Sequence, residues 1–241
     1  MLIESYLLEQ FEAVARCGTL LKASEELHIS QPSFNKYAET GNKECKWFRS
    51  INQNYPKFKE EDTMEFEKLI RERYSCRKLK DTPIEKEKLE RILEAGLAAP
   101  TGCNYQPYKL WVLTGEENCR VMSELTKYTF GAGTFIVVGA DPSKAWTRKY
   151  DGLNISTIDA SIVATHLMLG IHDAGLGSTW VGSFNAPEMK KRYPEMQDYE
   201  LIAIFPVGEI EEEARPAKLH YERKGISEMV RFDLMPTGDE I

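Results

Sequence analysis

Three apolar stretches constrain the fold of this 241-residue chain more than any other feature. They are KLWVLT at 109–114, TFIVVG at 134–139 and ELIAIFPV at 200–207, and each is bounded by Gly, Pro or charged residues. Runs so rich in β-branched and aromatic residues predict β-strands. Because polar residues do not alternate with the apolar ones, we expect both faces of the resulting sheet to be covered by helices.

Helices are expected around these strands. Thr82 and Pro83, followed by Glu85, are typical of a helix start with Thr82 as the N-cap, and this helix is expected to end near Ala98. The other helices are expected at 62–73, at 156–174 and after 185. The order of elements is not a regular β-α-β alternation with a glycine-rich first turn, so the sequence predicts an α+β layered fold rather than a doubly wound one.

The charge balance argues against nucleic acid as the default partner. The chain carries 31 Lys and Arg against 38 Asp and Glu, a net charge of −7, and such a chain repels phosphate backbones and anionic bilayers. No apolar run approaches the roughly 20 residues that a membrane-spanning helix requires. Glu4 and Glu9 stand where a secretory signal would carry basic residues. We therefore expect a cytoplasmic protein.

Metal and hydrolase chemistry have no recognisable signature in the sequence. The five cysteines are widely spaced, without a C-x-x-C pair, and the four histidines show no metal-ligand spacing. The glycine pairs at 131–133 and 175–177 lack a third glycine, and no P-loop, G-x-S-x-G or H-E-x-x-H motif occurs. We therefore predict reduced thiols, no metal site and no hydrolytic nucleophile.

The segment Arg73-Tyr74-Ser75-Cys76-Arg77 is the first of three candidate site segments, and it ends the helix expected from 62. Two guanidinium groups four residues apart, with a hydroxyl between them, can hold a phosphate through forked, charge-assisted hydrogen bonds. The alternative is a solvated basic helix end that complements the helix dipole.

The second candidate segment, 99–108, joins a helix to a strand. It presents the short polar side chains of Thr101, Asn104 and Gln106 on a backbone fixed by Pro100 and Pro107. Such a loop suits the rim of a site for a heteroaromatic ligand. An ordinary helix-to-strand connection uses similar residues, so both interpretations stay open.

The third candidate segment, 174–182, combines three glycines with Trp180. Glycines let a backbone approach a flat ring closely, and an indole can pack beside such a ring. The alternative is a helix stop followed by a buried aromatic residue. Later basic residues either complete a phosphate site or form a surface run: Arg215, Lys218, Arg223 and Lys224.

Taken in order, these segments resemble the FMN-dependent nitroreductase family over about residues 62–234. The matching pieces are Arg73-x-Ser75-x-Arg77, APTGCNYQP at 99–107, Asp159 with GLGSTWVG at 175–182, and PVGE at 206–209. The resemblance implies a central, mostly antiparallel sheet flanked by helices, in an intertwined homodimer with FMN at the subunit interface. It also implies that NADH or NADPH reduces FMN, which then reduces an electron-poor acceptor such as a nitroaromatic or a quinone by a ping-pong mechanism.

The resemblance also implies which residues contact FMN. Arg73, Ser75 and Arg77 would hold the phosphate, the ribityl chain and the ring edge, with Tyr74 adding a backbone contact. Either Lys218 or Arg223 would complete the phosphate site, and the spacing does not decide between them. The family pattern often has a basic residue or histidine at the position of Tyr74.

The remaining contacts implied by the resemblance come from the other two segments. Pro100, Thr101 and Asn104 would reach the flavin from the neighbouring subunit, and Gln106 would support their loop. The residues near the reactive ring nitrogen would be Trp180, Val181 and Gly182. Because the flavin itself carries the hydride chemistry, no catalytic side chain is assigned.

The first 36 residues carry a separate resemblance, to the start of a LysR-type helix-turn-helix, with Ser30-Gln31-Pro32 opening the recognition helix. The likeness stops after Ser33, and the helix breaker Gly41 follows within two turns. Residues 1–40 hold three basic and six acidic side chains, a net charge of 3 − 6 = −3, whereas phosphate contacts demand an excess of base. We interpret this segment as a remnant or as an accessory helix pair.

These observations divide the chain into a helical N-terminal extension with an irregular linker, 1–61, and an FMN-binding domain, 62–241. The favoured function is that of an NAD(P)H-dependent flavin oxidoreductase, and the alternative is a DNA-binding transcriptional regulator with a flavin-binding sensor domain. A third interpretation keeps the fold but changes the reaction, as in relatives that remove halogen or fragment the flavin. The shape of the cleft over the ring sets the acceptor, so the acceptor and the choice between NADH and NADPH stay open.

Overall fold

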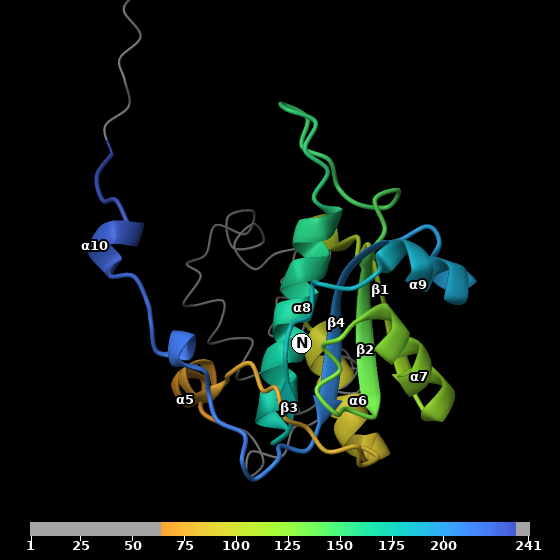
Figure 1. Cartoon of the computed structure of the whole chain (residues 1–241). Coiled ribbons are helices and arrows are strands. Elements are labelled where there is room, and N and C mark those ends of the chain that lie inside the picture. Colours follow the sequence, from red (N-terminus) through yellow and green to blue (C-terminus); the bar gives the residue numbers. More distant parts are fainter. Residues whose placement is uncertain (1–63, 235–241) are drawn as a thin grey trace, which may run out of the picture. The chain divides into compact units, whose positions relative to one another are not determined.

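A four-stranded antiparallel sheet lies at the centre of the part of the chain that the computed structural model describes, residues 64–234 (Figure 1). The strands are β1 (Tyr108–Thr114), β2 (Thr134–Ala140), β3 (Gly177–Ser178) and β4 (Glu200–Gly208), in the spatial order β1-β2-β4-β3. All neighbouring strands pair antiparallel. The predicted α+β fold is confirmed, and the three apolar stretches form its three long strands.

Successive side chains of the central strands enter two separate cores. On β2, Phe135 and Val137 belong to one core, while Ile136 and Val138 belong to the other. Every residue of β2 is buried. Because side chains alternate between the two faces of a strand and both faces are covered here, the sequence of β2 has no polar alternation.

Helices cover both faces of the sheet. The helices of the described residues are α5 (Phe66–Glu72), α6 (Lys86–Leu97), α7 (Glu116–Leu125), α8 (Ser156–Asp173), α9 (Ala186–Arg192) and α10 (Ile226–Met229), with short 3-10 turns η2 (Gly102–Asn104), η3 (Pro194–Met196) and η4 (Lys218–His220). Ile92 of α6 and Leu167 of α8 lie in one core, whereas Met122 of α7 and Met189 of α9 lie in the other. Figure 1 shows the two helix pairs on opposite sides of the sheet.

The start of α6 corrects one sequence prediction. Its N-cap residue is Glu85 and not Thr82. The backbone N–H groups of Leu79 and Lys80 donate to the carbonyls of Phe130 and Glu209, both at 2.9 Å, and this pairing holds the chain extended before the helix. The tertiary hydrogen bonds therefore override the local capping motif.

The starts of α9 and α7 can also be compared with the sequence predictions. The predicted start after Asn185 is confirmed, because the Asn185 side chain accepts a hydrogen bond from the Glu188 N–H at 3.1 Å. Helix α7 was not predicted. It follows Gly115, whose φ of 86° favours glycine, and it buries Val121, Met122 and Leu125.

Helix α8 connects two of the three candidate site segments. It has 18 residues, which corresponds to a length of about 27 Å. Its first turn contacts the loop that follows α6, through a hydrogen bond from Gly102 to Asp159. Its last turn is followed by Gly175, with a φ of 74°, and then by β3. The second and third segments thus contact opposite ends of one helix.

Some sequence predictions concern the whole chain, and the structure can be compared with them only over the described residues. Within residues 64–234, no helix is long and apolar enough to cross a membrane, and no group of three or more His, Cys, Asp or Glu side chains could hold a metal ion. The cysteines described there, Cys76, Cys103 and Cys119, are free. The N-terminal extension and its LysR-type segment lie outside the described residues, and the domain boundary at 61 stays a prediction.

Candidate functional site

The first candidate segment runs extended beside β3. The N–H of Cys76 donates to the carbonyl of Ser178 at 2.9 Å, and Ser75 forms a parallel bridge with Ser178. The Cys76 side chain is buried in the core. Because side chains alternate along an extended chain, Ser75 and Arg77 are directed away from that core.

A hollow of about 180 Å³ lies next to this segment. Its polar lining comes from two parts of the chain, the first candidate segment and the stretch around η4. The lining residues are Arg73, Ser75, Arg77, Ala217, Leu219, His220 and Arg223. The structure therefore brings together Arg73, Ser75, Arg77 and Arg223, which the sequence analysis grouped through the family resemblance.

Within residues 64–234, no carboxylate pairs with the guanidinium groups around the hollow. Among the described residues, Arg73, Arg77 and Arg223 form no salt bridge. Arg77 and Arg223 donate only to nearby backbone carbonyls, at 2.7 to 3.2 Å. Burial, and then the nearby charge of Arg223, lower the pKa of Arg73. Positive charges held together in this way favour an anion in the hollow.

Lys218 and Arg223, the two residues between which the sequence does not decide, lie in different surroundings. The Lys218 side chain is 92% exposed and pairs with Glu222 at 3.6 Å. It does not line the hollow, whereas Arg223 does. The turn of η4 separates the two residues, so that only Arg223 lies beside Arg73 and Arg77.

His220 also lines the hollow, and sequence reasoning missed it. Its ring makes edge contacts with Tyr74 and Tyr221, at centroid distances of 6.3 and 4.8 Å. A single histidine in a basic stretch has no motif around it, so only the fold shows that it belongs with the arginines.

The second candidate segment has an unusual backbone. Cys103, Asn104 and Gln106 have φ angles of 51°, 55° and 50°, in the left-handed region. Such conformations cost energy in residues other than glycine and are concentrated at functional sites. The side chains of Asn104 and Gln106 are exposed, and the Thr101 hydroxyl accepts a hydrogen bond from the Gln106 N–H at 3.0 Å. Pro100 is exposed beside them.

Asp159 holds this loop from the first turn of α8. One carboxylate oxygen accepts a hydrogen bond from the Gly102 N–H at 2.9 Å, and the other is buried without a partner. The residue is only 2% exposed. A Cβ on Gly102 would lie 2.5 Å from Cδ1 of Ile155, so a larger residue at this position would displace the end of the Ile155 side chain.

The third candidate segment pairs with β4. Val181 is buried, and its N–H and carbonyl both bond to Ile204, at 2.9 and 3.0 Å. Trp180 is half-buried and packs edge-on against Phe205, at 5.4 Å between ring centroids. Gly182 is exposed. The side chain and both backbone hydrogen-bonding groups of Val181 are thus occupied within the sheet, while Trp180 and Gly182 have accessible surface.

Comparisons with known proteins identify the fold and the family. The model of the "Nitroreductase family" matches residues 70–128 and 120–209, which together span more than half of the chain. An Archaeoglobus fulgidus protein, named provisionally as an NADH dehydrogenase/NAD(P)H nitroreductase, is 34% identical over 146 residues, which are 58% of this chain and 80% of that protein. The chain belongs to the nitroreductase family. The predicted family resemblance is confirmed, and the chain is an oxidoreductase.

Solved structures of nitroreductase family proteins support the same assignment. A nitroreductase family protein from Clostridium difficile 630 is 35% identical, with a TM-score of 0.66, and the match covers 71% of this chain and 100% of that one. A protein described as an FMN-dependent nitroreductase, from Clostridium difficile R20291, is 26% identical, with a TM-score of 0.57 and coverages of 69% and 99%.

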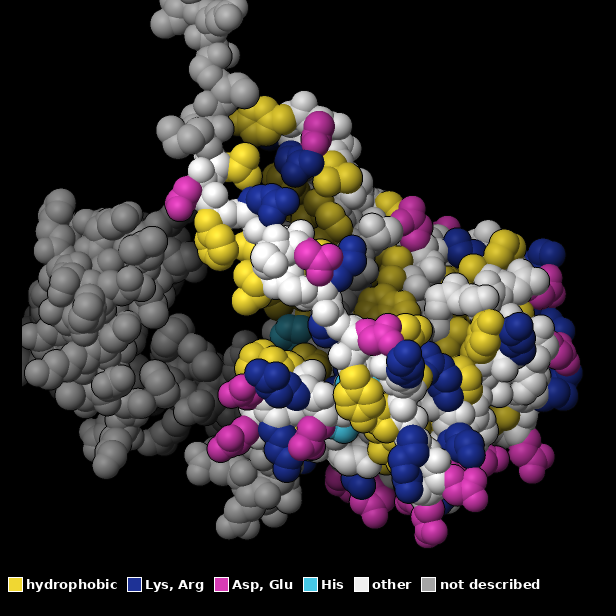
Figure 2. Space-filling view, turned by 60° about the vertical axis from the view of Figure 1, so that its left-hand side comes forward, with side chains coloured by type: hydrophobic (Ala, Val, Ile, Leu, Met, Phe, Trp, Pro, Cys, Tyr) yellow, Lys and Arg dark blue, Asp and Glu magenta, His cyan; other side chains and the backbone are white. Residues whose placement is uncertain are grey.

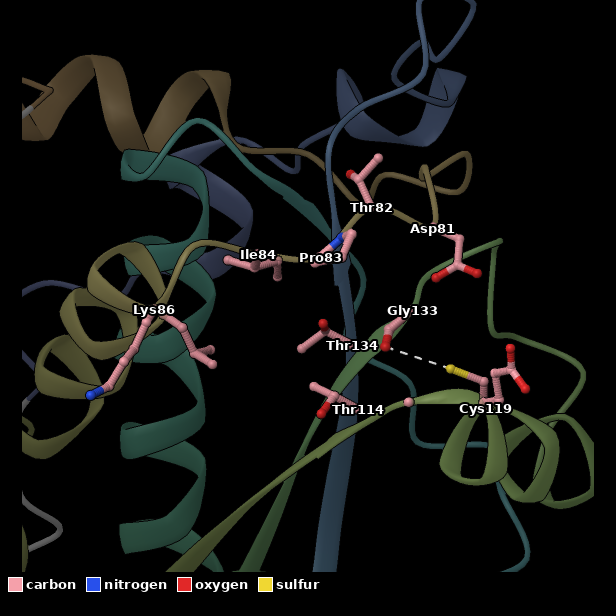
Figure 3. Close-up of a pocket in the computed structure, with 12 residues that line it drawn as sticks. Asp81, Thr82, Pro83, Ile84, Lys86, Thr114, Cys119, Gly133 and Thr134 are labelled. Carbon is pink, nitrogen blue, oxygen red and sulfur yellow. Dashed lines mark hydrogen bonds between the residues drawn. The ribbon is translucent and has the colours of Figure 1, made fainter.

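A larger cavity of this nitroreductase family member, about 610 Å³, has a different lining (Figure 3). It is bordered by Asp81 and Thr82, by Cys119 on α7 and by Thr134 at the start of β2. None of the residues predicted to contact FMN lines it. Its lining carries two acidic groups, Asp81 and Glu116, against one basic group, Lys86, so it offers a phosphate no excess of positive charge, and size alone does not identify the cofactor site.

Proposed function

We propose that this chain is an FMN-dependent oxidoreductase that takes electrons from NADH or NADPH and reduces an electron-poor acceptor, such as a nitroaromatic or a quinone, in a ping-pong sequence. The observation that carries the proposal is the hollow lined by Arg73, Arg77 and Arg223, which have no acidic partner among the described residues. A phosphate monoester supplies the negative charge and the acceptor oxygens that these groups lack.

The residues present fit the phosphate end of FMN. Arg73, Arg77 and Arg223 would bind the phosphate oxygens, and the Ser75 hydroxyl, on the same side of the segment, would bind the adjoining ribityl chain. Tyr74 would contribute through its backbone. The names of the relatives agree with this cofactor and donor: one is called an FMN-dependent nitroreductase, and a Staphylococcus aureus relative of which the chain spans 60% is called an NADPH-dependent oxidoreductase.

Bound FMN supplies the hydride chemistry in this proposal. The chain's own residues bind and orient it: the arginines fix one end, and the exposed surface of Trp180 and Gly182 lies in the segment that continues from β3. The loop with Pro100, Thr101, Asn104 and Gln106 would border the ring of a flavin held by a second copy. No proton-transfer role is assigned to a side chain.

The geometry of α8 supports the participation of a second copy. The first candidate segment bridges to Ser178 beyond the C-terminal end of α8, whereas the loop is held by Asp159 in its first turn. The helix between them is about 27 Å long, so one subunit does not bring both segments to one ring. We propose a homodimer in which each site combines both ends of α8, one from each subunit.

The stretch after β4 supports an intertwined form of this dimer. Its large hydrophobic side chains are exposed in the single chain, and Figure 2 shows hydrophobic side chains standing along it. They are Leu219, Tyr221, Ile226, Met229, Val230, Phe232 and Leu234. An exposed hydrophobic run of this kind is typical of a surface that another protein segment covers. A second copy of the chain would cover it.

The visible absorption spectrum of the purified full chain tests the proposed function. We expect a flavin spectrum, FMN as the chromophore released on denaturation, and bleaching on addition of NADH or NADPH without oxygen and without an acceptor. Reduction in the absence of an acceptor is the first half of a ping-pong cycle. A colourless protein that takes up no added FMN would overturn the proposal.

The alternative function, a DNA-binding regulator, depends on residues 1–36, which lie outside the described residues. Deletion of this segment separates the two functions. The oxidoreductase proposal expects flavin reduction to be nearly unchanged by the deletion, whereas loss of salt-dependent binding to DNA on deletion would support the regulator.

A further inference from the structure

His220 shares the hollow with the three arginines. It is the last residue of η4, and its ring lies edge-on to Tyr74 of the first candidate segment and to Tyr221. Contacts on two sides restrict the orientation of the imidazole. A ring held in place at the edge of an anion site is available as a hydrogen-bond donor without the entropy loss of ordering a free side chain.

The charges that face His220 are almost entirely positive. Arg73 and Arg77 come from the first candidate segment, and Arg223 comes from the stretch after η4. The nearest acidic residue in its own stretch, Glu222, pairs with Lys218. Burial, aided by the Cys76 thiol, raises the pKa of Tyr74 to about 12. The Tyr74 side chain therefore brings no negative charge to His220 at neutral pH. No carboxylate lines the hollow in the described part of the chain.

A bound phosphate changes this environment. Phosphate monoesters carry between one and two negative charges near neutral pH, and an imidazole that gains an anionic partner binds its proton more tightly. Histidine is the side chain that titrates between about pH 5 and pH 8. Protonation of His220 and binding of a phosphate therefore favour each other.

We propose that His220 is a further phosphate-binding residue and that its protonation makes FMN affinity depend on pH. The inference rests on the FMN-dependent function proposed above. The protonated imidazole adds a charged hydrogen bond to the phosphate. This contribution exists only while the imidazole is protonated, so it is larger in acidic than in alkaline solution.

The test compares FMN and riboflavin binding by the full chain, freed of bound flavin, and by the variant His220→Gln. Glutamine keeps a hydrogen-bond donor but cannot be charged. We expect FMN binding by the variant to be weaker about tenfold at about pH 6, the scale of one charged hydrogen bond, and weaker less than about threefold at about pH 8. Riboflavin, which lacks the phosphate, should bind the variant and the wild type equally.

Two more variants make the result specific. His220→Lys carries a permanent charge, so it should retain FMN binding at about pH 8 and flatten the pH dependence. Lys218→Gln changes a neighbouring cation outside the hollow, and FMN binding should then change by less than about twofold at either pH. The variants are compared with the wild type at the same pH, so the FMN phosphate has the same charge in each binding measurement. Titration of the phosphate therefore does not affect the comparison.

Three outcomes would overturn the role of His220: an equal loss for FMN at both pH values, an equal loss for riboflavin, or no loss at all. Each of them leaves FMN binding by the wild type intact and so leaves the proposed function standing. If the wild type binds neither FMN nor riboflavin, the proposed function itself is wrong, and the inference about His220 is wrong with it.

Discussion

At the C-terminal end of α8, three guanidinium groups surround a hollow of about 180 Å³, whereas at its N-terminal end one buried carboxylate holds a loop with three left-handed residues. The first region concentrates charge on a regular, strand-paired backbone. The second concentrates backbone strain with almost no charge. The comparison suggests a division of labour, in which one end would bind the anionic part of a ligand and the other would shape the wall of a cleft.

Removal of a guanidinium should have the largest effect and should act on ligand binding alone. In Arg77→Ala, we expect FMN affinity to fall by about 1.5 to 3 kcal/mol, the contribution of a hydrogen bond to a charged group. The free energy of unfolding should stay nearly constant, because the Arg77 side chain bonds only to the neighbouring Ser75 carbonyl.

A flavin titration and a urea denaturation curve measure these two quantities for Arg77→Ala. Lys218→Ala is the matched control, because Lys218 lies outside the hollow and its exposed pair with Glu222 contributes little. Unchanged FMN affinity in Arg77→Ala would remove Arg77 from the site.

Removal of the carboxylate at the other end should act first on stability. Asp159→Ala leaves the Gly102 N–H without its partner, so we expect a loss of about 1 to 2 kcal/mol in the free energy of unfolding. The arginine hollow is untouched by this change, so binding of inorganic phosphate should be retained. Thr157→Ala, at an exposed position in the same turn of α8, is the control and should change stability by less than about 0.5 kcal/mol.

The smallest effect should come from relaxing the strained loop. Cys103 is exposed, with a φ of 51°, so Cys103→Gly should stabilise the fold by about 0.5 kcal/mol. Tyr105→Gly, at a φ of −74°, should destabilise it, because glycine there only loses conformational entropy. A destabilising Cys103→Gly in thermal unfolding would show that the loop is not strained.

The sequence predicted the long strands of the sheet well, because one feature, a continuous apolar run, identifies each of them. The apolar runs of β2 and β4 are decisive because their side chains are buried on both faces of the sheet, whereas only Trp111 is buried on the edge strand β1. The N-cap at Thr82 was wrong because the capping motif competes with pairing of Leu79 and Lys80 to distant segments. Helix α7 begins after Gly115 without a side-chain cap, so it lacks the start signal that Asn185 gives to α9.

In the candidate site, too, the sequence predicted what a local motif encodes and missed what the tertiary structure brings together. Arg73, Ser75 and Arg77 form a local motif, so the sequence alone could group them. The choice of Arg223 over Lys218 and the presence of His220 depend on how η4 turns, and no spacing rule encodes this. The left-handed residues at 103, 104 and 106 were also not predicted, because the pattern of Pro and polar residues there also fits ordinary loops.

The central claim, that each site takes the arginine hollow from one subunit and the loop from the other, is tested most directly by complementation between two inactive variants. One variant carries Arg77→Ala, and the other replaces the loop residues Thr101, Asn104 and Gln106 by alanine. After unfolding and refolding together, half of the dimers pair one variant with the other, and each of these has one intact site of two. The account predicts recovery of about a quarter of the wild-type NAD(P)H oxidation rate from an equimolar mixture. A mixture no more active than the two variants measured separately would contradict it.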